Sequence, residues 1–206
     1  MARRAHDDPA VFCARVLGVD VRPFQARWLR AQAESDRTLV LAPRGHGKST
    51  LCTVGFTLWR IARSPETRIL LASATAFQAE GFLRQVRAQI ESCHALRRLF
   101  GLRPDRPWTG SEIAVARRGL YKEPTVTALG VGGAVIGRHY DTIVCDDVVD
   151  RDSAATAEQR RRLREWFGAV LVPCLEPTGT LHLVGTRWHD DDLYGDIIRT
   201  QHGDTQ

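Results

Sequence analysis

Blocks of apolar and polar residues follow one another along the chain, and the spacing inside each block predicts a secondary-structure element. Short, mainly apolar runs predict buried strands at 38–41, 68–73, 141–147 and 180–184. Apolar positions three or four residues apart predict helices at 48–63, 75–91 and 157–171, and a last helix capped by Asp190 that runs to 198. This alternation favours an α/β fold with a mainly parallel central sheet flanked by helices.

Two segments depart from the alternation. Residues 1–35 predict a helical lead-in to the first strand. Residues 101–135 are rich in glycine and proline, with short β-like pieces at 113–116 and 125–128, and predict a hairpin or another β-rich elaboration at the sheet edge. Because no repeat or low-complexity linker divides the chain, we expect a single domain over 1–206.

Composition narrows the class of protein. The chain has 206 residues, 43% of them hydrophobic, which is enough for one full-sized core. It lacks both the apolar run of about 20 residues that spans a bilayer and the apolar core of a secretory signal, so we expect a cytoplasmic protein without a membrane partner. The five cysteines form no C-x-x-C pair and are expected to be reduced core residues. The net charge of +5 is compatible with a phosphate-rich partner such as DNA but does not establish one.

A phosphate-binding loop stands between the first strand and the first long helix. Residues 42–49 read APRGHGKS and fit the pattern A/G-x-x-x-x-G-K-S/T. Lys48 is expected to reach the β- and γ-phosphates of ATP and Ser49 to ligate Mg²⁺, while backbone N–H groups cradle the phosphates. The expected nucleotide contacts are Ala42, Pro43, Arg44, Gly45, His46, Gly47, Lys48, Ser49 and Thr50. The alternative, a chance G-K-S in a turn, is disfavoured by the flanking strand and helix.

Two acids end the strand at 141–147. Asp146 is expected to hold Mg²⁺, usually through water, and Asp147 to orient and activate the attacking water as the catalytic carboxylate. Many such ATPases have glutamate at the second position, and aspartate is one methylene shorter. The alternatives are that Asp147 only caps a turn and that Asp146 is an ordinary acid at the end of a strand.

Further candidate site residues carry weaker signals. Arg44, inside the loop, can stabilise transition-state charge as an arginine finger in cis, or it can simply face solvent. Gln25 precedes the first strand, and its amide can pair with adenine. Thr186 follows the last strand, where a hydroxyl can sense the γ-phosphate. The run His189-Asp190-Asp191-Asp192 has acids that suit a helix N-terminus better than a metal site.

Together these segments resemble a family. RPFQ, APRGHGKST, LLASATAFQA, DTIVCDD and GTRWHDDDLYG occur in the order found in the large terminase subunits of tailed bacteriophages, over about residues 20–200. The resemblance implies an ATPase domain of the additional-strand, RecA-like P-loop class. In that family Gln25 matches the adenine contact, and Arg44, Lys48 and Ser49 match the phosphate loop. Asp146 and Asp147 match the Mg²⁺ acid and the catalytic carboxylate, and Thr186 matches the coupling motif.

The resemblance also implies a biological setting. Large terminases are motors that package double-stranded DNA into a procapsid in the host cytoplasm, as a homo-oligomeric ring on the portal protein, with a small terminase subunit that selects the DNA. They also carry a C-terminal nuclease domain, for which 206 residues leave no room, so we expect the isolated ATPase domain.

Other functions stay open at this point. The alternatives are a helicase-like or other DNA-dependent ATPase, and a non-hydrolysing nucleotide-binding remnant. A ring ATPase can also take an arginine from its neighbour, and Arg138, just before the acid-bearing strand, is a weak candidate for that role in trans.

Overall fold

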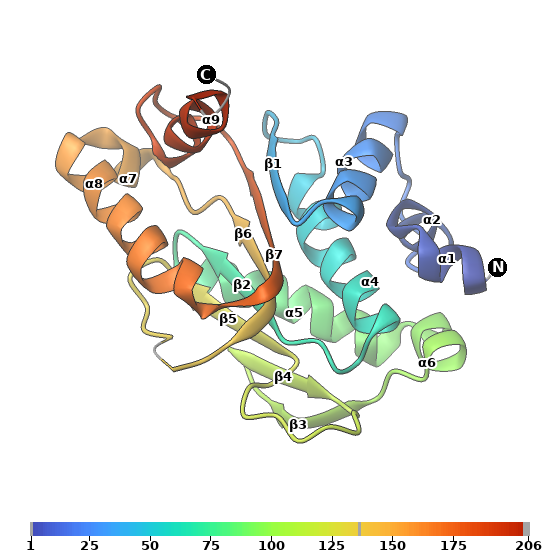
Figure 1. Ribbon diagram of the computed structural model, residues 1–206. Coiled ribbons are helices and arrows are strands. Elements are labelled where there is room, and N and C mark those ends of the chain that lie inside the picture. Colours follow the sequence, from blue (N-terminus) through green and yellow to red (C-terminus); the bar gives the residue numbers. More distant parts are fainter. Residues whose placement is uncertain (1, 136, 204–206) are drawn as a thin grey trace.

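Seven strands form one twisted sheet in a computed structural model that describes residues 2–135 and 137–203 (Figure 1). The order across the sheet is β1-β7-β6-β2-β5-β4-β3. The strands are β1 (Arg37–Leu41), β2 (Ile69–Ser73), β3 (Pro104–Trp108), β4 (Glu112–Val115), β5 (Val126–Gly130), β6 (Tyr140–Asp146) and β7 (Leu175–Gly185). The pairs from β1 to β5 are parallel, and β4 and β3 add antiparallel pairs at one edge. The predicted α/β fold with a mainly parallel sheet is therefore confirmed.

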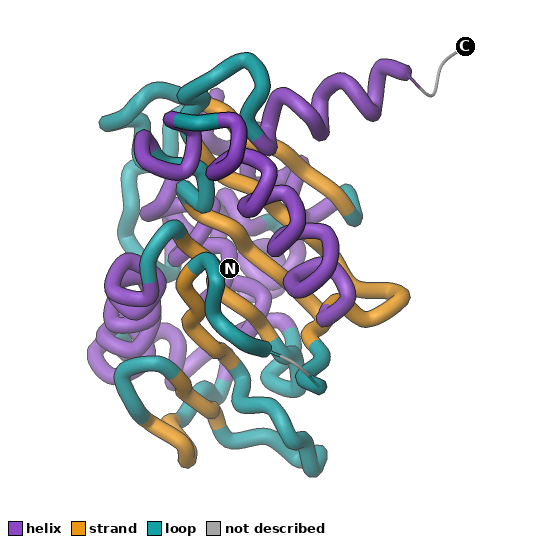
Figure 2. The backbone as a smooth tube through the Cα atoms, turned by 90° about the vertical axis from the view of Figure 1, so that its left-hand side faces the viewer, coloured by secondary structure: helices purple, strands orange, loops and turns teal. Residues whose placement is uncertain are grey.

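Helices cover both faces of the sheet. They are α1 (Ala2–Asp7), α2 (Pro9–Arg15), α3 (Pro23–Glu34), α4 (Phe56–Arg63), α5 (Ala76–Ser92), α6 (His94–Phe100), α7 (Arg151–Ala155), α8 (Ala157–Trp166) and α9 (Leu193–Gly203). Helices α1–α6 lie on one side and α7–α9 on the other, and Figure 2 shows the strands running between them. None of the helices in the described part of the chain has both the length and the apolar character needed to cross a membrane.

The side chains of β2 show how this sheet builds two cores. Ile69 and Leu71 pack into the cluster that contains Phe12, Phe56 and other residues of the α1–α6 side. Leu70 and Ala72 point to the opposite face, into the cluster of the α7–α9 side. All five β2 residues are buried, as expected for a central parallel strand, whose side chains alternate between two covered faces.

The helix after the phosphate loop differs from the regular helix predicted for 48–63. Its first part, Ser49–Gly55, is a π-helix, and the α-helical part α4 starts only at Phe56. A side chain on Gly55 would lie 2.7 Å from the Sγ atom of Cys13, so glycine allows this segment to approach α2 closely. Widened turns of this kind are frequent at functional sites.

The segment 101–135 holds three strands of the sheet, and one of them, β5, belongs to its parallel part. The two β-like pieces predicted at 113–116 and 125–128 correspond to β4 and β5, which pair antiparallel, and β3, which the sequence pattern does not predict, pairs antiparallel with β4. On its other side β5 pairs in parallel with β2, so it also belongs to the central sheet. Gly130 at its end allows this placement, because a Cβ atom there would lie 2.4 Å from the backbone nitrogen of Ala76, at the start of α5.

A second π-helix, Phe167–Leu171, and a 3₁₀ turn, Val172–Cys174, lead from α8 into β7. All five cysteines are free, and Cys13, Cys52, Cys145 and Cys174 are buried.

Candidate nucleotide-binding site

Three neighbouring parallel strands bring the predicted site residues to one edge of the sheet. β7 lies between β1 and β6, with Leu41 in register with Gly185 and Asp146 in register with Val184. The segments that follow these strands therefore emerge side by side, at the carboxyl edge where α/β sheets bind ligands.

Lys48 lies at the centre of this edge and is buried, with 6% of its surface exposed. Its Nζ donates hydrogen bonds to the carbonyl oxygens of Ala42 (2.7 Å) and Pro43 (3.1 Å) and to the hydroxyl of Thr186 (3.2 Å). Gly45 and Gly47 take positive φ angles of 80° and 72°, which allow the loop to fold back around this ammonium group. The loop thus surrounds a buried cation, as a phosphate-binding loop requires.

Gln25 supports the phosphate loop from outside. Its side-chain amide donates to the carbonyl oxygen of His46 (2.8 Å) and accepts from the backbone N–H of Arg22 (2.8 Å). A Cβ atom on Gly47 would lie only 2.9 Å from the Gln25 nitrogen, so the glycine makes room for this support. The adenine contact expected of Gln25 stays a prediction, because both ends of the amide bind protein atoms.

Asp146 has the surroundings of a cation ligand. It is fully buried, and its Oδ2 accepts a hydrogen bond from the hydroxyl of Thr53 (2.6 Å). Its Oδ1 is buried and has no hydrogen-bond partner among the described residues. Burial raises the pKa of Asp146 to about 6, while the nearby hydroxyls of Thr53 and Ser49 oppose the rise. A buried carboxylate oxygen without a partner, close to a serine hydroxyl, matches the oxygen ligands that Mg²⁺ prefers.

Asp147 follows β6 in a left-handed backbone conformation, with φ at 47°, and no other described non-glycine residue has a positive φ. This conformation turns the side chain toward Thr186, whose backbone N–H donates to Asp147 Oδ1 (3.1 Å). Burial raises the pKa of Asp147, while the charges of Lys48 and Arg44 and the Thr186 hydrogen bond oppose the rise. Strained backbone held beside buried charges is typical of a functional residue.

Arg44 is exposed on the phosphate loop, near enough to Asp147 to influence its pKa. The guanidinium forms no ion pair or hydrogen bond with any residue that the structure describes. It lies over the indole ring of Trp188, with its carbon 5.2 Å from the ring centroid. His46 and Thr50 are also exposed, so of the loop residues Lys48 is the one most enclosed by protein.

The comparisons with known proteins agree with this geometry. The chain is 29% identical over 174 residues to the large terminase subunit of Enterobacteria phage T3, an alignment that covers 81% of this chain and 28% of that protein. The crystal structure of the HK97 bacteriophage large terminase superposes with a TM-score of 0.63 at 16% identity, covering 95% of this chain and 42% of that one. A mutant of the large terminase ATPase domain of Thermus phage P74-26 superposes with a TM-score of 0.58 at 14% identity, covering 86% and 70%.

The fold is that of a phage large-terminase ATPase domain. The resemblance to large terminases that the sequence segments indicate is confirmed. The chain spans 28% of the length of the T3 subunit. No protein-family model matches the chain.

The segment after β7 connects the site of this terminase-like domain to its last helix. Asp192 is fully buried and accepts hydrogen bonds from the backbone N–H groups of Trp188 and His189 (3.2 Å each) and of Gly195 (2.9 Å). Asp192 therefore caps α9, which begins at Leu193, and the prediction of Asp190 as the cap is wrong. The register of the cap follows from the turn at 189–192, closed by a hydrogen bond from the Asp192 N–H to the His189 carbonyl oxygen (3.2 Å), which the sequence pattern does not fix.

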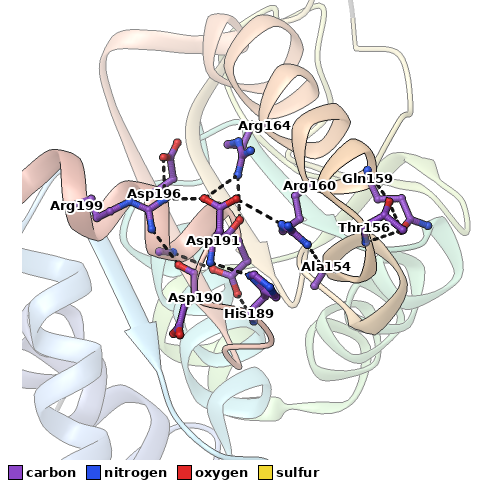
Figure 3. A network of polar contacts seen from close by, with 12 residues as sticks. Ala154, Thr156, Gln159, Arg160, Arg164, His189, Asp190, Asp191, Asp196 and Arg199 are labelled. Atoms are coloured by element: carbon purple, nitrogen blue, oxygen red, sulfur yellow. Dashed lines mark hydrogen bonds and ion pairs between the residues drawn. The ribbon is translucent and has the colours of Figure 1, made fainter.

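Asp191 joins the same segment to α8 and α9 (Figure 3). Its carboxylate accepts from Arg199 (3.0 Å) and lies 3.6 Å from Arg160 and 3.8 Å from Arg164. The three consecutive arginines of α8 thus differ in role, since Arg160 faces this network whereas its two successors pair with Glu158 on the exposed side. The acids of the segment therefore cap α9 and form ion pairs.

The candidate site brings together most of the residues predicted for it and includes three that were not predicted. Lys48, Ser49, Asp146, Asp147 and Thr186 converge, with Arg44 beside them. The residues not predicted are Thr53, Ser73, whose hydroxyl donates to the Asp146 carbonyl (2.7 Å), and Trp188. Thr53 could have been found, because it lies four residues after Ser49 on the same helix face. The other two depend on tertiary contacts.

Proposed function

We propose that this chain is the ATPase motor domain of a phage DNA-packaging terminase, which binds ATP with Mg²⁺ and hydrolyses it to drive double-stranded DNA into a procapsid. One observation carries the proposal: a buried lysine in a phosphate loop lies beside two carboxylates, one of which has a free buried oxygen and the other a strained backbone. The likeness to terminase ATPase domains supplies the biological setting.

Each residue has a role that its surroundings support. Ser49 and Asp146 would hold Mg²⁺, which when bound offsets the negative charge of the β- and γ-phosphates. Lys48, whose donors contact loop carbonyls and Thr186, would exchange some of these bonds for phosphate oxygens. Asp147 would orient the attacking water and accept its proton, and its raised pKa brings it closer to the operating pH of a general base.

Arg44 and Thr186 would act on the terminal phosphate. Arg44 carries a charge that no described residue neutralises, which suits it to the negative charge that develops on the transferred phosphoryl group. Thr186 contacts Lys48 through its hydroxyl and Asp147 through its backbone, so a movement of either side chain would alter the contacts of Thr186. Because Thr186 leads through Asp191 and Asp192 to α8 and α9, this segment would pass the change to distant elements.

The partners belong to the same proposal. We expect double-stranded DNA to bind through its phosphates, as the net charge of +5 favours. The portal protein, the small terminase subunit and a homo-oligomeric ring in the host cytoplasm follow from the terminase likeness, as does the single ATPase domain over 1–206.

The test is ATP hydrolysis by the purified chain, with and without Mg²⁺ and with and without double-stranded DNA. Lys48→Ala should lower turnover at least about a hundredfold, because the phosphates lose their main cation. The chain has one other lysine, Lys122, which donates to the carbonyl oxygen of Gly137 away from the site, so Lys122→Ala is the matched control with normal turnover. Equal turnover in the two variants would refute the site.

A further inference from the structure

Trp188 presents its indole ring at the edge of the nucleotide site. The residue is 38% exposed, and the guanidinium of Arg44 lies over its ring. Guanidinium groups are attracted to the face of an indole by the ring quadrupole and also stack on it, because both groups are planar. Among the described residues, no hydrogen bond, ion pair or other cation–π pair involves the Arg44 guanidinium.

The backbone of Trp188 is fixed on both sides. Two residues earlier, the Thr186 N–H is bonded to the catalytic candidate Asp147. The N–H of Trp188 itself is bonded to the fully buried carboxylate of Asp192, which also holds His189 and the start of α9. The indole is therefore attached to a rigid segment, whereas Arg44 lies on an exposed loop and has a long side chain with many rotamers.

We propose that Trp188 is a positioning residue that holds the Arg44 guanidinium beside Asp147, where the terminal phosphate of ATP would lie. The inference deepens the proposed ATPase function and rests on it. An exposed arginine loses much rotamer freedom when it binds a phosphate. A platform that limits this freedom beforehand makes the guanidinium more effective in the transition state, and it would do so without touching the nucleotide itself.

The first experiment measures kcat and KM for ATP in Trp188→Leu and Trp188→Phe, each alone and combined with Arg44→Ala. We expect Trp188→Leu to lower kcat about two- to fivefold with little change in KM, the size expected for an exposed cation–π contact. Trp188→Phe should recover most of the loss because it keeps an aromatic face. In the Arg44→Ala background, Trp188→Leu should have no further effect, since the two residues act as one unit.

Trp108 offers a matched control. It also has an arginine over its ring, Arg87 at 5.7 Å, but it lies on β3 at the far edge of the sheet. Trp108→Leu should leave kcat unchanged. An equal loss of kcat from Trp188→Leu in the presence and absence of Arg44, or a failure of Trp188→Phe to restore activity, would overturn the inference.

A second readout needs no turnover and so separates this inference from the proposed function. The fluorescence of Trp188 is obtained as the difference between the wild type and Trp188→Phe. Arg44→Ala should shift or intensify that difference spectrum, while Arg87→Ala should leave it unchanged. An unaltered Trp188 spectrum in Arg44→Ala would refute the contact, whereas absent ATP hydrolysis with an altered spectrum would refute the proposed function alone.

Discussion

Strand β6 has an aspartate near each end, and the two side chains have opposite surroundings. Asp141, at the start, accepts hydrogen bonds from Arg68 through its backbone N–H (2.8 Å), its Nε (3.1 Å) and its Nη2 (2.7 Å). Asp146, at the other end, is fully buried, forms no ion pair with any described residue and has one carboxylate oxygen without a hydrogen-bond partner. The two aspartates are five residues apart on one strand.

The difference separates a structural acid from the one that we propose to be functional. At the amino edge the charge of Arg68 is shared by Asp141, Glu176 and Glu123, so the protein satisfies these charges by itself. At the carboxyl edge, the buried carboxylate of Asp146 has no ion-pair partner among the described residues, and a buried charge of this kind lowers the stability of the fold. An arrangement of that kind is understandable where a bound cation restores the balance, because binding to the native state stabilises it.

The largest expected effect is a loss of ATP hydrolysis when an acid at the carboxyl edge is replaced. Asp147→Asn should lower kcat for ATP hydrolysis about a hundred- to ten-thousandfold, since an amide cannot accept a proton from water. Affinity for Mg²⁺–ATP, measured by calorimetry, should stay within about threefold because the phosphate loop is intact.

Asp141→Asn is the control for this prediction and should leave kcat normal. If Asp147→Asn weakened nucleotide binding as strongly as it slowed hydrolysis, Asp147 would be a metal ligand and the two acids would have exchanged roles.

The next effect is on stability and has an unusual sign. In EDTA at pH 7.5, Asp146→Asn should raise the free energy of unfolding by about 3 kcal/mol, because the pKa of Asp146 in the fold is about 6 against 3.8 ordinarily. The wild-type fold binds a proton there that the unfolded chain releases, so its stability falls as pH rises from about 4 to 6 and stays low above.

Urea unfolding at pH 5 and pH 7.5 checks this sign. The advantage of Asp146→Asn should shrink at pH 5 and should also shrink when Mg²⁺–ATP is added to the wild type. A destabilised Asp146→Asn protein at pH 7.5 in EDTA would mean that the carboxylate is already compensated, as Asp141 is.

The third effect runs in the opposite direction. Asp141→Asn should lower the free energy of unfolding by about 1–2 kcal/mol, since Arg68 keeps its hydrogen bond to Glu176 but loses charged ones to Asp141. Chemical unfolding at neutral pH measures it, and addition of Mg²⁺–ATP should stabilise this variant as much as the wild type. A gain in stability would remove the distinction between the two ends of β6.

Most of the candidate site at the carboxyl edge of the sheet can be predicted from the sequence, whereas few of the contacts at the amino edge can. The glycines and Lys48 of the loop form a local pattern, and a parallel sheet necessarily places Asp146 beside it. The bonds of Arg68, by contrast, reach residues 73 and 108 positions away, and no local spacing encodes such pairs. The sequence predicts Asp147 as a site residue but does not predict its left-handed backbone conformation, because that conformation results from contacts with the ends of neighbouring strands.

Short elements show the same limit. Helix α6, His94–Phe100, escapes a periodicity argument because it is two turns long and follows α5 with only Cys93 between them. β5 pairs antiparallel with β4, as its place beside a turn-rich stretch suggests, but nothing in its own sequence indicates the second, parallel pairing with β2. Its place beside β2 depends on the close approach of Gly130 to α5, which only the folded chain reveals.

The smallest expected effect concerns Arg138, which precedes β6 at the same amino edge of the sheet as Asp141. Its guanidinium forms an ion pair with Glu112 on β4, and the two side chains are 37% and 28% exposed. Partly exposed pairs contribute little, so Arg138→Ala should change the free energy of unfolding by less than about 1 kcal/mol.

Because the guanidinium of Arg138 already has a partner within its own chain, far from the phosphate loop, we also expect normal DNA-stimulated turnover of Arg138→Ala in an assembled ring. The trans role would instead require mixtures of Arg138→Ala and Asp147→Asn subunits to recover activity that neither has alone. Such recovery would show that this end of β6 also serves catalysis, in a neighbouring subunit, and that the contrast between its two ends holds only within one chain.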